Sequence, residues 1–200
     1  MPPASRLVPR YAAEPPHDGV PDGPWRDRLC AEFLGAAQRV ADESGEPGEL
    51  VFYPDRSWHG RTYVPAAAPT STGMEIYGFV AYVPGGGEDG EPDDFIAQVD
   101  FTEETAERNP DWELDLSDEV VGSWRGHGDR VAAMTLVWGR SLIPGGNLVT
   151  ALLGGVDVDQ CRLDGDRFTL LAPDDFGGDL LEVRLYSADG EELARESLYE

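Results

Sequence analysis

From Glu49 to the C-terminus, short apolar segments alternate with turn-forming residues, and this rhythm constrains the fold more than any other feature. The apolar segments have strand length and are rich in valine, leucine and aromatic residues. Glycine, proline and aspartate separate them, as is typical of chains that fold into antiparallel sheets. The pattern predicts a mainly β (α+β) fold that is β-sandwich-like, built as one body or as two packed β lobes, with one N-terminal amphipathic helix.

Individual segments predict how deeply each strand is buried. Residues 75–83 and 131–138 are apolar on both faces, which favours central strands covered on both sides. Residues 95–102 alternate and predict one solvated face. In 156–163 the apolar side chains change face midway, so we expect a β-bulge near Asp159 and Gln160.

The N-terminal part of the chain has a different pattern. Seven prolines within residues 1–24 predict a disordered tail, with a docking segment as the alternative. Residues 25–44 predict a helix, because apolar side chains recur at helical spacing at Trp25, Leu29, Phe33, Ala37 and Val40. Residues 25–200 are therefore expected to form a single globular domain, with the helix followed by a β lobe at 48–130 and a sandwich-like lobe at 131–200.

The charge of the chain excludes several partners and chemistries. There are 39 acidic and 15 basic residues, every basic residue is arginine, and the formal net charge is -24. Nucleic acid and anionic membranes are disfavoured because both are bound largely through basic groups. A basic or neutral protein or ligand remains compatible as a partner. The absence of lysine excludes Schiff-base chemistry and the phosphate-binding P-loop.

Targeting features and cysteines predict a cytoplasmic protein. The N-terminus has no apolar segment typical of a signal peptide, and no apolar run reaches the length of a membrane-spanning helix. Two cysteines are too few for a disulfide framework. We expect Cys30 and Cys161 to be small buried apolar residues.

The motifs with possible cofactor chemistry are weak. Residues 85–90 spell G-x-G-x-x-G after a strand, but the acidic residues around this loop would repel a diphosphate and no helix follows. Aspartates at 157–166 and 174–179 could hold Ca²⁺, yet aspartate also favours turns by bonding to its own backbone. The sequence therefore predicts no cofactor and no metal.

Two loops of similar composition are the best candidate site in the sequence. Loops 55–61 and 123–130 both contain Ser-Trp together with glycine, histidine, arginine and aspartate. An aromatic plane, a guanidinium group and an imidazole on a rigid sheet can build a ligand site. We call these loops the two-loop surface. Its predicted ligand-binding residues are Arg56, Trp58, His59, Arg61, Trp124, Arg125 and His127, and no catalytic residue is predicted.

These features favour a non-enzymatic, cytoplasmic binding or interaction module that uses the two-loop surface on a β scaffold. One alternative is an acidic inhibitor-type protein that occupies a basic surface on its partner. The other is a hydrolase that uses loop carboxylates or histidines. A purely structural interpretation, in which the tryptophans cover the ends of the core, also remains open.

Overall fold

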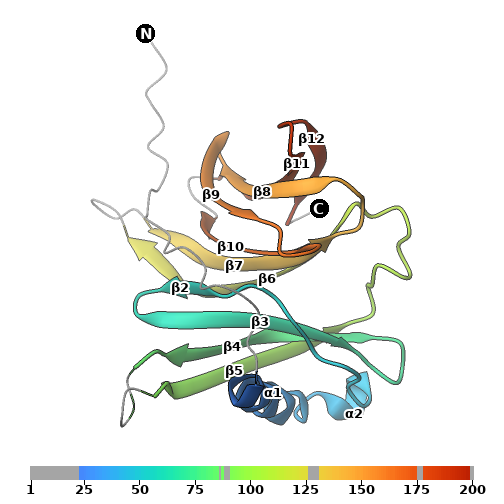
Figure 1. The fold of residues 1–200 in the computed structure, drawn as a ribbon, viewed down its shortest axis with the longest axis vertical. Helices are drawn as coiled ribbons and strands as arrows, with labels where there is room; N and C mark the ends of the chain where they lie inside the picture. Colours follow the sequence, from blue (N-terminus) through green and yellow to red (C-terminus); the bar gives the residue numbers. More distant parts are fainter. Residues whose placement is uncertain (1–22, 86, 88–90, 126–130, 175–177, 199–200) are drawn as a thin grey trace.

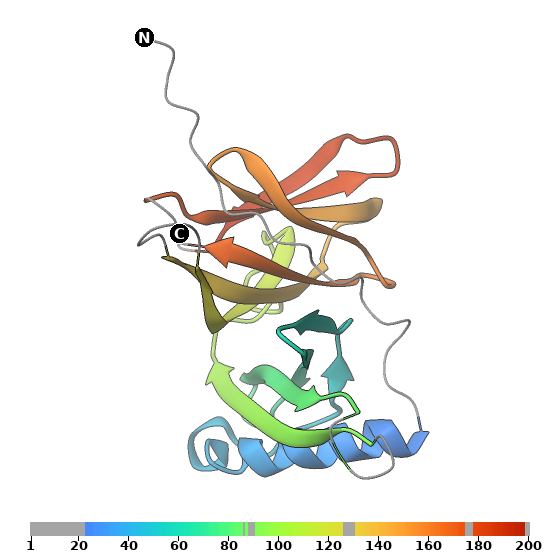
Figure 2. The same cartoon turned by 90° about the vertical axis from the view of Figure 1, so that its left-hand side faces the viewer.

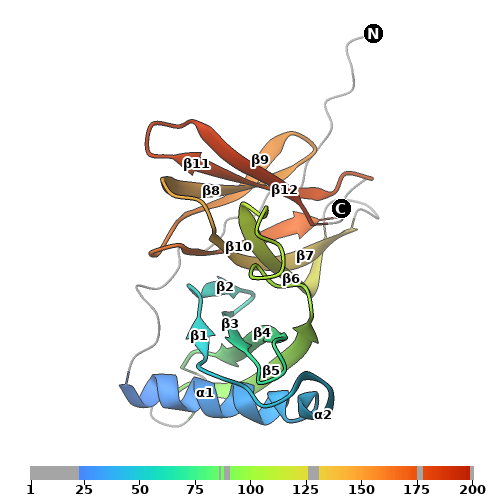
Figure 3. The same cartoon turned by 90° about the vertical axis from the view of Figure 1, so that its right-hand side faces the viewer.

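The computed structural model describes residues 23–85, 87, 91–125, 131–174 and 178–198 and has four stacked layers (Figure 1). One helical layer covers the first of three antiparallel sheets, and the middle sheet lies between the other two (Figure 3). The prediction of a mainly β fold with a sandwich and one N-terminal helix is confirmed. No helix of the described ranges is long and apolar enough to span a membrane.

Helix α1, Gly23–Ala37, lies across the outer face of the first sheet (Figure 2). The predicted apolar stripe is confirmed, because Leu29, Phe33 and Ala37 are buried against that sheet. The helix was expected to continue to residue 44. Instead, Arg39 donates its backbone N–H to the carbonyl of Ala36, three residues back, and α1 ends at Ala37. A four-residue helix, α2, Ala41–Ser44, follows. Residues 1–22 of the expected disordered tail lie outside the described residues.

The N-terminal sheet has five strands in the order β1-β3-β4-β5, with β2 paired to the other end of β3. Its strands are β1 (Val51–Phe52), β2 (Arg56–Trp58), β3 (Arg61–Pro69), β4 (Glu75–Val83) and β5 (Asp93–Thr102). The buried strand predicted at 75–83 is confirmed as β4, which lies between β3 and β5. Residues 85–90, where the glycine-rich loop was expected, are described only at 85 and 87.

The middle sheet has the order β10-β7-β6, and the C-terminal sheet has the order β12-β11-β8-β9. Their strands are β6 (Leu114–Arg125), β7 (Val131–Ser141), β8 (Gly146–Leu153), β9 (Val156–Arg162), β10 (Arg167–Asp174), β11 (Leu181–Ser187) and β12 (Glu192–Ser197). Strand β6 pairs with β7 along its whole length. The lobe boundary expected at residue 130 therefore falls between two strands of one sheet.

The bulge predicted near Asp159 is confirmed within one residue. Ala151 of β8 pairs with Asp159, whereas the next residue, Leu152, pairs with Asp157, so Val158 is the extra residue of β9. A turn joins Asp164 to Arg167. The two strands that it connects nevertheless belong to different sheets, because β9 pairs with β8 and β10 pairs with β7.

The three sheets enclose two cores of different composition. We call the contact between the middle and C-terminal sheets the aliphatic interface; its fully buried side chains include Val149, Leu170 and Val183. We call the contact between the N-terminal and middle sheets the aromatic interface; it is built around Tyr63, Phe79 and Trp138. Both candidate sites described below lie at the edges of the aromatic interface.

Candidate functional site

The first loop of the two-loop surface is a tight β-hairpin between β2 and β3. Trp58 pairs with Arg61, which leaves His59 and Gly60 as a two-residue turn. Both have positive φ angles, 52° and 75°, as a type I′ turn requires. His59 is exposed, and its ring centroid lies 4.2 Å from that of Trp58.

The structure brings Trp58 and Trp124 to the same side of the molecule. The ring of Trp58 covers Gly122 of β6, where an added Cβ atom would lie only 2.3 Å from Trp58 Cζ3. Trp124 follows two residues later, on the same face of the strand as Gly122. Both indoles are partly buried at the margin of the aromatic interface. Strand β2 and the end of strand β6, which are far apart in the sequence, therefore lie close together, with their tryptophans neither fully exposed nor enclosed.

The arginines of the two-loop surface have different environments. Arg56 points into the protein, where its side chain is only 3% exposed, and forms an ion pair of 3.0 Å with Asp159. It also donates to the carbonyl oxygens of Thr169 and Gln160, at 2.9 and 3.1 Å. These protein acceptors leave Arg56 turned away from solvent.

The other predicted residues of this surface lie nearer solvent. Arg61 forms an ion pair with Asp94 and donates to the Asp94 carbonyl at 2.8 Å. Arg125, at the end of β6, is exposed. His127 lies outside the described residues, so its predicted place in the two-loop surface stays a prediction.

A cleft that the sequence analysis did not predict lies at the other end of the aromatic interface. It is a cavity of about 420 Å³ between the N-terminal sheet and the middle sheet. Its walls come from five parts of the chain: Val51, Tyr53, Ala67, Ala68, Pro69, Thr70, Gly73, Met74, Glu75, Thr105, Ala106, Glu107, Arg140, Asp166 and Arg167. We call this cavity the interlobe cleft. Its volume is in the range of small-molecule sites.

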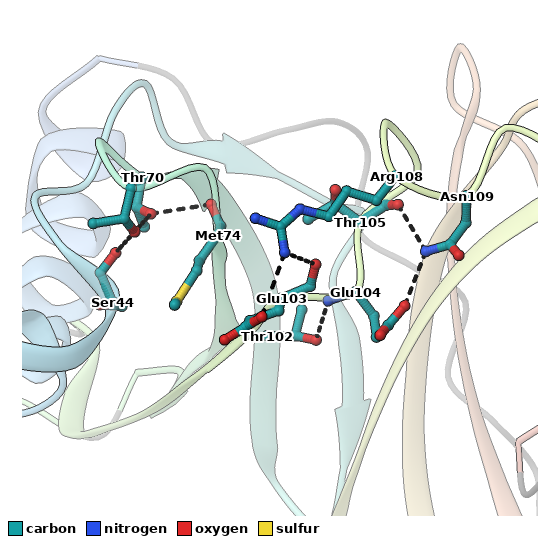
Figure 4. A network of polar contacts seen from close by, with 10 residues as sticks. Ser44, Thr70, Met74, Thr102, Glu103, Glu104, Thr105, Arg108 and Asn109 are labelled. Atoms are coloured by element: carbon teal, nitrogen blue, oxygen red, sulfur yellow. Dashed lines mark hydrogen bonds and ion pairs between the residues drawn. The ribbon is translucent and has the colours of Figure 1, made fainter.

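The β3–β4 turn and the β5–β6 connection both contribute residues to the wall of the interlobe cleft. Figure 4 shows the polar contacts of these two loops. In the β3–β4 turn, Thr70 donates its hydroxyl to the carbonyl of Met74 at 3.1 Å. In the β5–β6 connection, Asn109 donates to the Glu104 carboxylate at 3.0 Å and to the Thr105 carbonyl at 3.1 Å. These bonds are local to each loop, so each loop is braced internally at the rim of the cleft.

Two arginines lie side by side on the middle-sheet wall. Arg140 of β7 and Arg167 of β10 are directly opposite each other in the strand pairing. Arg140 donates its Nε to Asp115 at 3.0 Å. Arg167 donates one terminal nitrogen to the Phe52 carbonyl at 2.7 Å and lies 3.6 Å from Asp166. Like charges placed opposite each other on neighbouring strands repel.

The opposite wall carries a carboxyl and a phenol with shifted pKa values. Burial, and then the nearby Asp115 carboxylate, raise the pKa of Glu75 to about 7, and Arg140 opposes the shift. Burial also raises the pKa of Tyr53, with a further contribution from Glu75. A carboxyl group titrating near neutral pH inside a cleft is a recognised sign of a functional site.

Glu75 also borders a smaller cavity of about 160 Å³. Tyr77, Glu104, Asp115 and Asp118 line it as well. Despite these acids, no three His, Cys, Asp or Glu side chains gather as metal ligands would within the described part of the chain.

The sequence held only a faint signal for the interlobe cleft. Glu75, Asp115, Arg140 and Arg167 are charged residues at or near the ends of strands that are otherwise apolar. Taken alone, each of these residues is typical of the end of a strand and does not indicate a binding site. A comparison with protein-family models, with curated proteins and with solved structures gives no match to this chain.

Proposed function

We propose that the protein is a non-enzymatic binding module whose ligand occupies the interlobe cleft. The observation that carries this proposal is a cavity of about 420 Å³ walled by two sheets, with titratable and cationic groups on its facing walls. Ligand sites are typically mostly apolar cavities with a few convergent polar groups. Residues from the apolar wall, such as Val51, Ala67, Ala68 and Met74, fit that description.

A cytoplasmic location is part of the proposal. Cys30 and Cys161 are both unpaired. Burial raises the pKa of the Cys161 thiol to about 11, so this cysteine is protonated and poorly nucleophilic at neutral pH. These properties agree with structural thiols in a reducing compartment and favour binding over thiol catalysis.

The test is a ligand screen with a blocked cleft. A fragment library is screened by two-dimensional NMR, and hits are chosen that shift the backbone amides of Ala68, Gly73 and Thr105. The variant Ala106→Trp places a large ring at the rim of the cavity. We expect it to abolish these shifts, since the added ring occupies the space that the ligand needs.

The matched control is Ala188→Trp, in the exposed turn between β11 and β12, far from the cleft in the fold. It should leave the hits unchanged. Hits that map elsewhere, or that bind Ala106→Trp unchanged, would overturn the proposed site. Turnover of a compound by the native protein would replace the binding module with the hydrolase alternative.

A second candidate function is recognition of a basic partner by the two-loop surface. It is favoured by the indole planes of Trp58 and Trp124, on which a cationic side chain can stack, on a protein of net charge -24. A lysine-rich peptide should shift the amides of residues 58–61 and 123–125, and the shifts should weaken as salt rises to physiological strength. Shifts scattered evenly over the acidic surface would contradict a specific site there.

A further inference from the structure

We propose that the interlobe cleft recognises the carboxylate group of a small apolar acid, held between the paired arginines of the middle sheet and the polar groups of the facing wall. This inference rests on the binding function proposed above and names the class of ligand. Arg140 and Arg167 supply the positive charge, and Tyr53 and Glu75 lie across the cavity from the sheet that carries them.

The arrangement of the two arginines is the first argument. They are directly opposite in the β7–β10 pairing, and their side chains are 39% and 35% exposed. Asp115 takes only the Nε of Arg140, and no described residue accepts from its two terminal nitrogens. A planar carboxylate fits such a guanidinium fork and would offset the repulsion between the two cations.

The facing wall provides the second argument. Tyr53 is only 7% exposed, it lines the cavity, and its hydroxyl has no hydrogen-bond partner among the described residues. The Glu75 carboxyl likewise has neither an ion pair nor a hydrogen bond within them. Both groups line the cavity, so one ligand oxygen there could accept a hydrogen bond from the Tyr53 hydroxyl and from the neutral Glu75 carboxyl.

The apolar part of the cavity and the acidic residues at its rim limit further which ligands can bind. Val51, Ala67, Ala68, Met74 and Ala106 provide a wall for a hydrocarbon or aromatic body. The rim carries Glu107 and Asp166, and Asp115 lies behind Arg140. These carboxylates would repel a dianion more strongly than a monoanion, which favours a single carboxylate over a phosphate group.

Binding should depend on the protonation of Glu75. Asp115 raises the pKa of Glu75, and Arg140 lowers it. The other titratable or charged groups around the two cavities that Glu75 borders are Tyr53, Glu107, Asp166 and Arg167 in the interlobe cleft, and Tyr77, Glu104 and Asp118 in the smaller cavity. The neutral acid donates a hydrogen bond to a carboxylate, whereas the ionised acid repels it. Affinity should therefore fall by about tenfold between pH 6 and pH 8, as Glu75 ionises.

The test uses three probes that share one ring and differ in charge: benzoate, benzyl alcohol and benzylammonium. Each is titrated into the native protein, and the amide shifts of Ala68, Gly73 and Thr105 report binding in the cleft. We expect benzoate to bind at least tenfold more tightly than the other two at pH 6. Inorganic phosphate, as a dianionic comparison, should bind more weakly than benzoate.

Two variants assign the roles of the residues. Glu75→Gln keeps the shape and stays neutral, so its affinity for benzoate should become independent of pH between 6 and 8. Arg140→Lys keeps the charge but loses the fork, and should weaken benzoate binding at least tenfold without changing benzyl alcohol binding. Arg195→Lys, on the exposed β12 strand of the far sheet, is the matched control and should change neither probe.

The outcomes separate the two proposals. If benzyl alcohol, benzylammonium or phosphate binds the cleft as tightly as benzoate, the carboxylate inference is wrong while the binding function stands. A pH-independent native affinity, or an unchanged affinity in Arg140→Lys, would also contradict the inference. If none of the probes shifts the cleft amides and the fragment screen also fails, the binding function itself is overturned.

Discussion

The two interfaces between the sheets differ in what they bury. The aliphatic interface packs fully buried leucine, valine and alanine side chains between the middle and C-terminal sheets. The aromatic interface has tyrosine, phenylalanine and tryptophan at its centre, and charged groups at its margins. An ion pair from Arg56 of the N-terminal sheet to Asp159 of the C-terminal sheet lies at one margin, and the interlobe cleft lies at another.

The difference indicates that one interface stabilises the fold and the other provides a binding site. An apolar contact gains stability from its buried area and needs no specific charge state. A contact bordered by carboxyl, phenol and guanidinium groups gains less and responds to protons and ligands. The aliphatic interface therefore suits a rigid support, and the aromatic interface suits a site.

The largest expected effect comes from breaking the buried ion pair at the margin of the aromatic interface. Arg56→Ala leaves the Asp159 carboxylate, with a side chain 5% exposed, without its cation. We expect the free energy of unfolding to fall by about 3–5 kcal/mol in chemical denaturation. Arg195→Ala, which breaks an exposed pair with Glu192, should cost less than about 1 kcal/mol. Equal effects of the two variants would remove the distinction between buried and exposed pairs.

A smaller effect concerns the pH response of the same interface. The pKa of Glu75 is about 7 in the folded protein and 4.5 ordinarily, so the folded state favours the neutral acid. Its contribution to stability is present below pH 4.5 and is lost as pH rises through 7. Glu75→Gln should therefore match the native protein near pH 4 and exceed its free energy of unfolding by about 1–2 kcal/mol at pH 8, after allowance for partial exposure.

The control for this prediction is Glu191→Gln, in an exposed turn of the C-terminal sheet. Denaturation curves of this variant should follow those of the native protein from pH 4 to pH 8. If Glu75→Gln also follows them at every pH, Glu75 titrates normally and the interface is not the pH-sensitive one.

An effect of similar size tests the contact between the two tryptophan-bearing segments. Gly122→Ala adds a methyl group where the Trp58 ring now lies, at 2.3 Å from Cζ3, so the ring must move. We expect a loss of about 1–3 kcal/mol and a shift of the Trp58 indole NMR signal. Gly35→Ala is the counterpart on helix α1, where nothing lies within 4 Å. It should instead stabilise the protein by about 0.5–1 kcal/mol.

The strands could be predicted from the sequence because local alternation decides them. The segment 75–83 is found as β4, and the change of face in 156–163 marks the bulge at Val158. The end of α1 and the distribution of strands between sheets could not be predicted. β9 and β10 follow one another through a tight turn, yet their partners are strands β8 and β7, and such pairing depends on the whole chain.

The candidate sites show the same limit. Trp58 and Trp124 were both predicted for the two-loop surface, and the Trp58 ring lies against Gly122, two residues before Trp124. Their role in ligand binding stays a prediction. The burial of Arg56 was not expected, because its acceptors, Asp159, Gln160 and Thr169, come more than 100 residues later. The interlobe cleft was missed for a related reason, since Glu75 and Arg167 are both unremarkable at their own strand ends.

The order of the sheets has a consequence for how the chain is made. The N-terminal sheet ends at Thr102, but the strand that completes its cover, β10, ends at Asp174. At about 5–20 residues per second, the ribosome needs roughly 4–14 s to make the intervening length. We expect Tyr63 and Phe79 to be uncovered during that interval, so the nascent chain should then depend most on a chaperone.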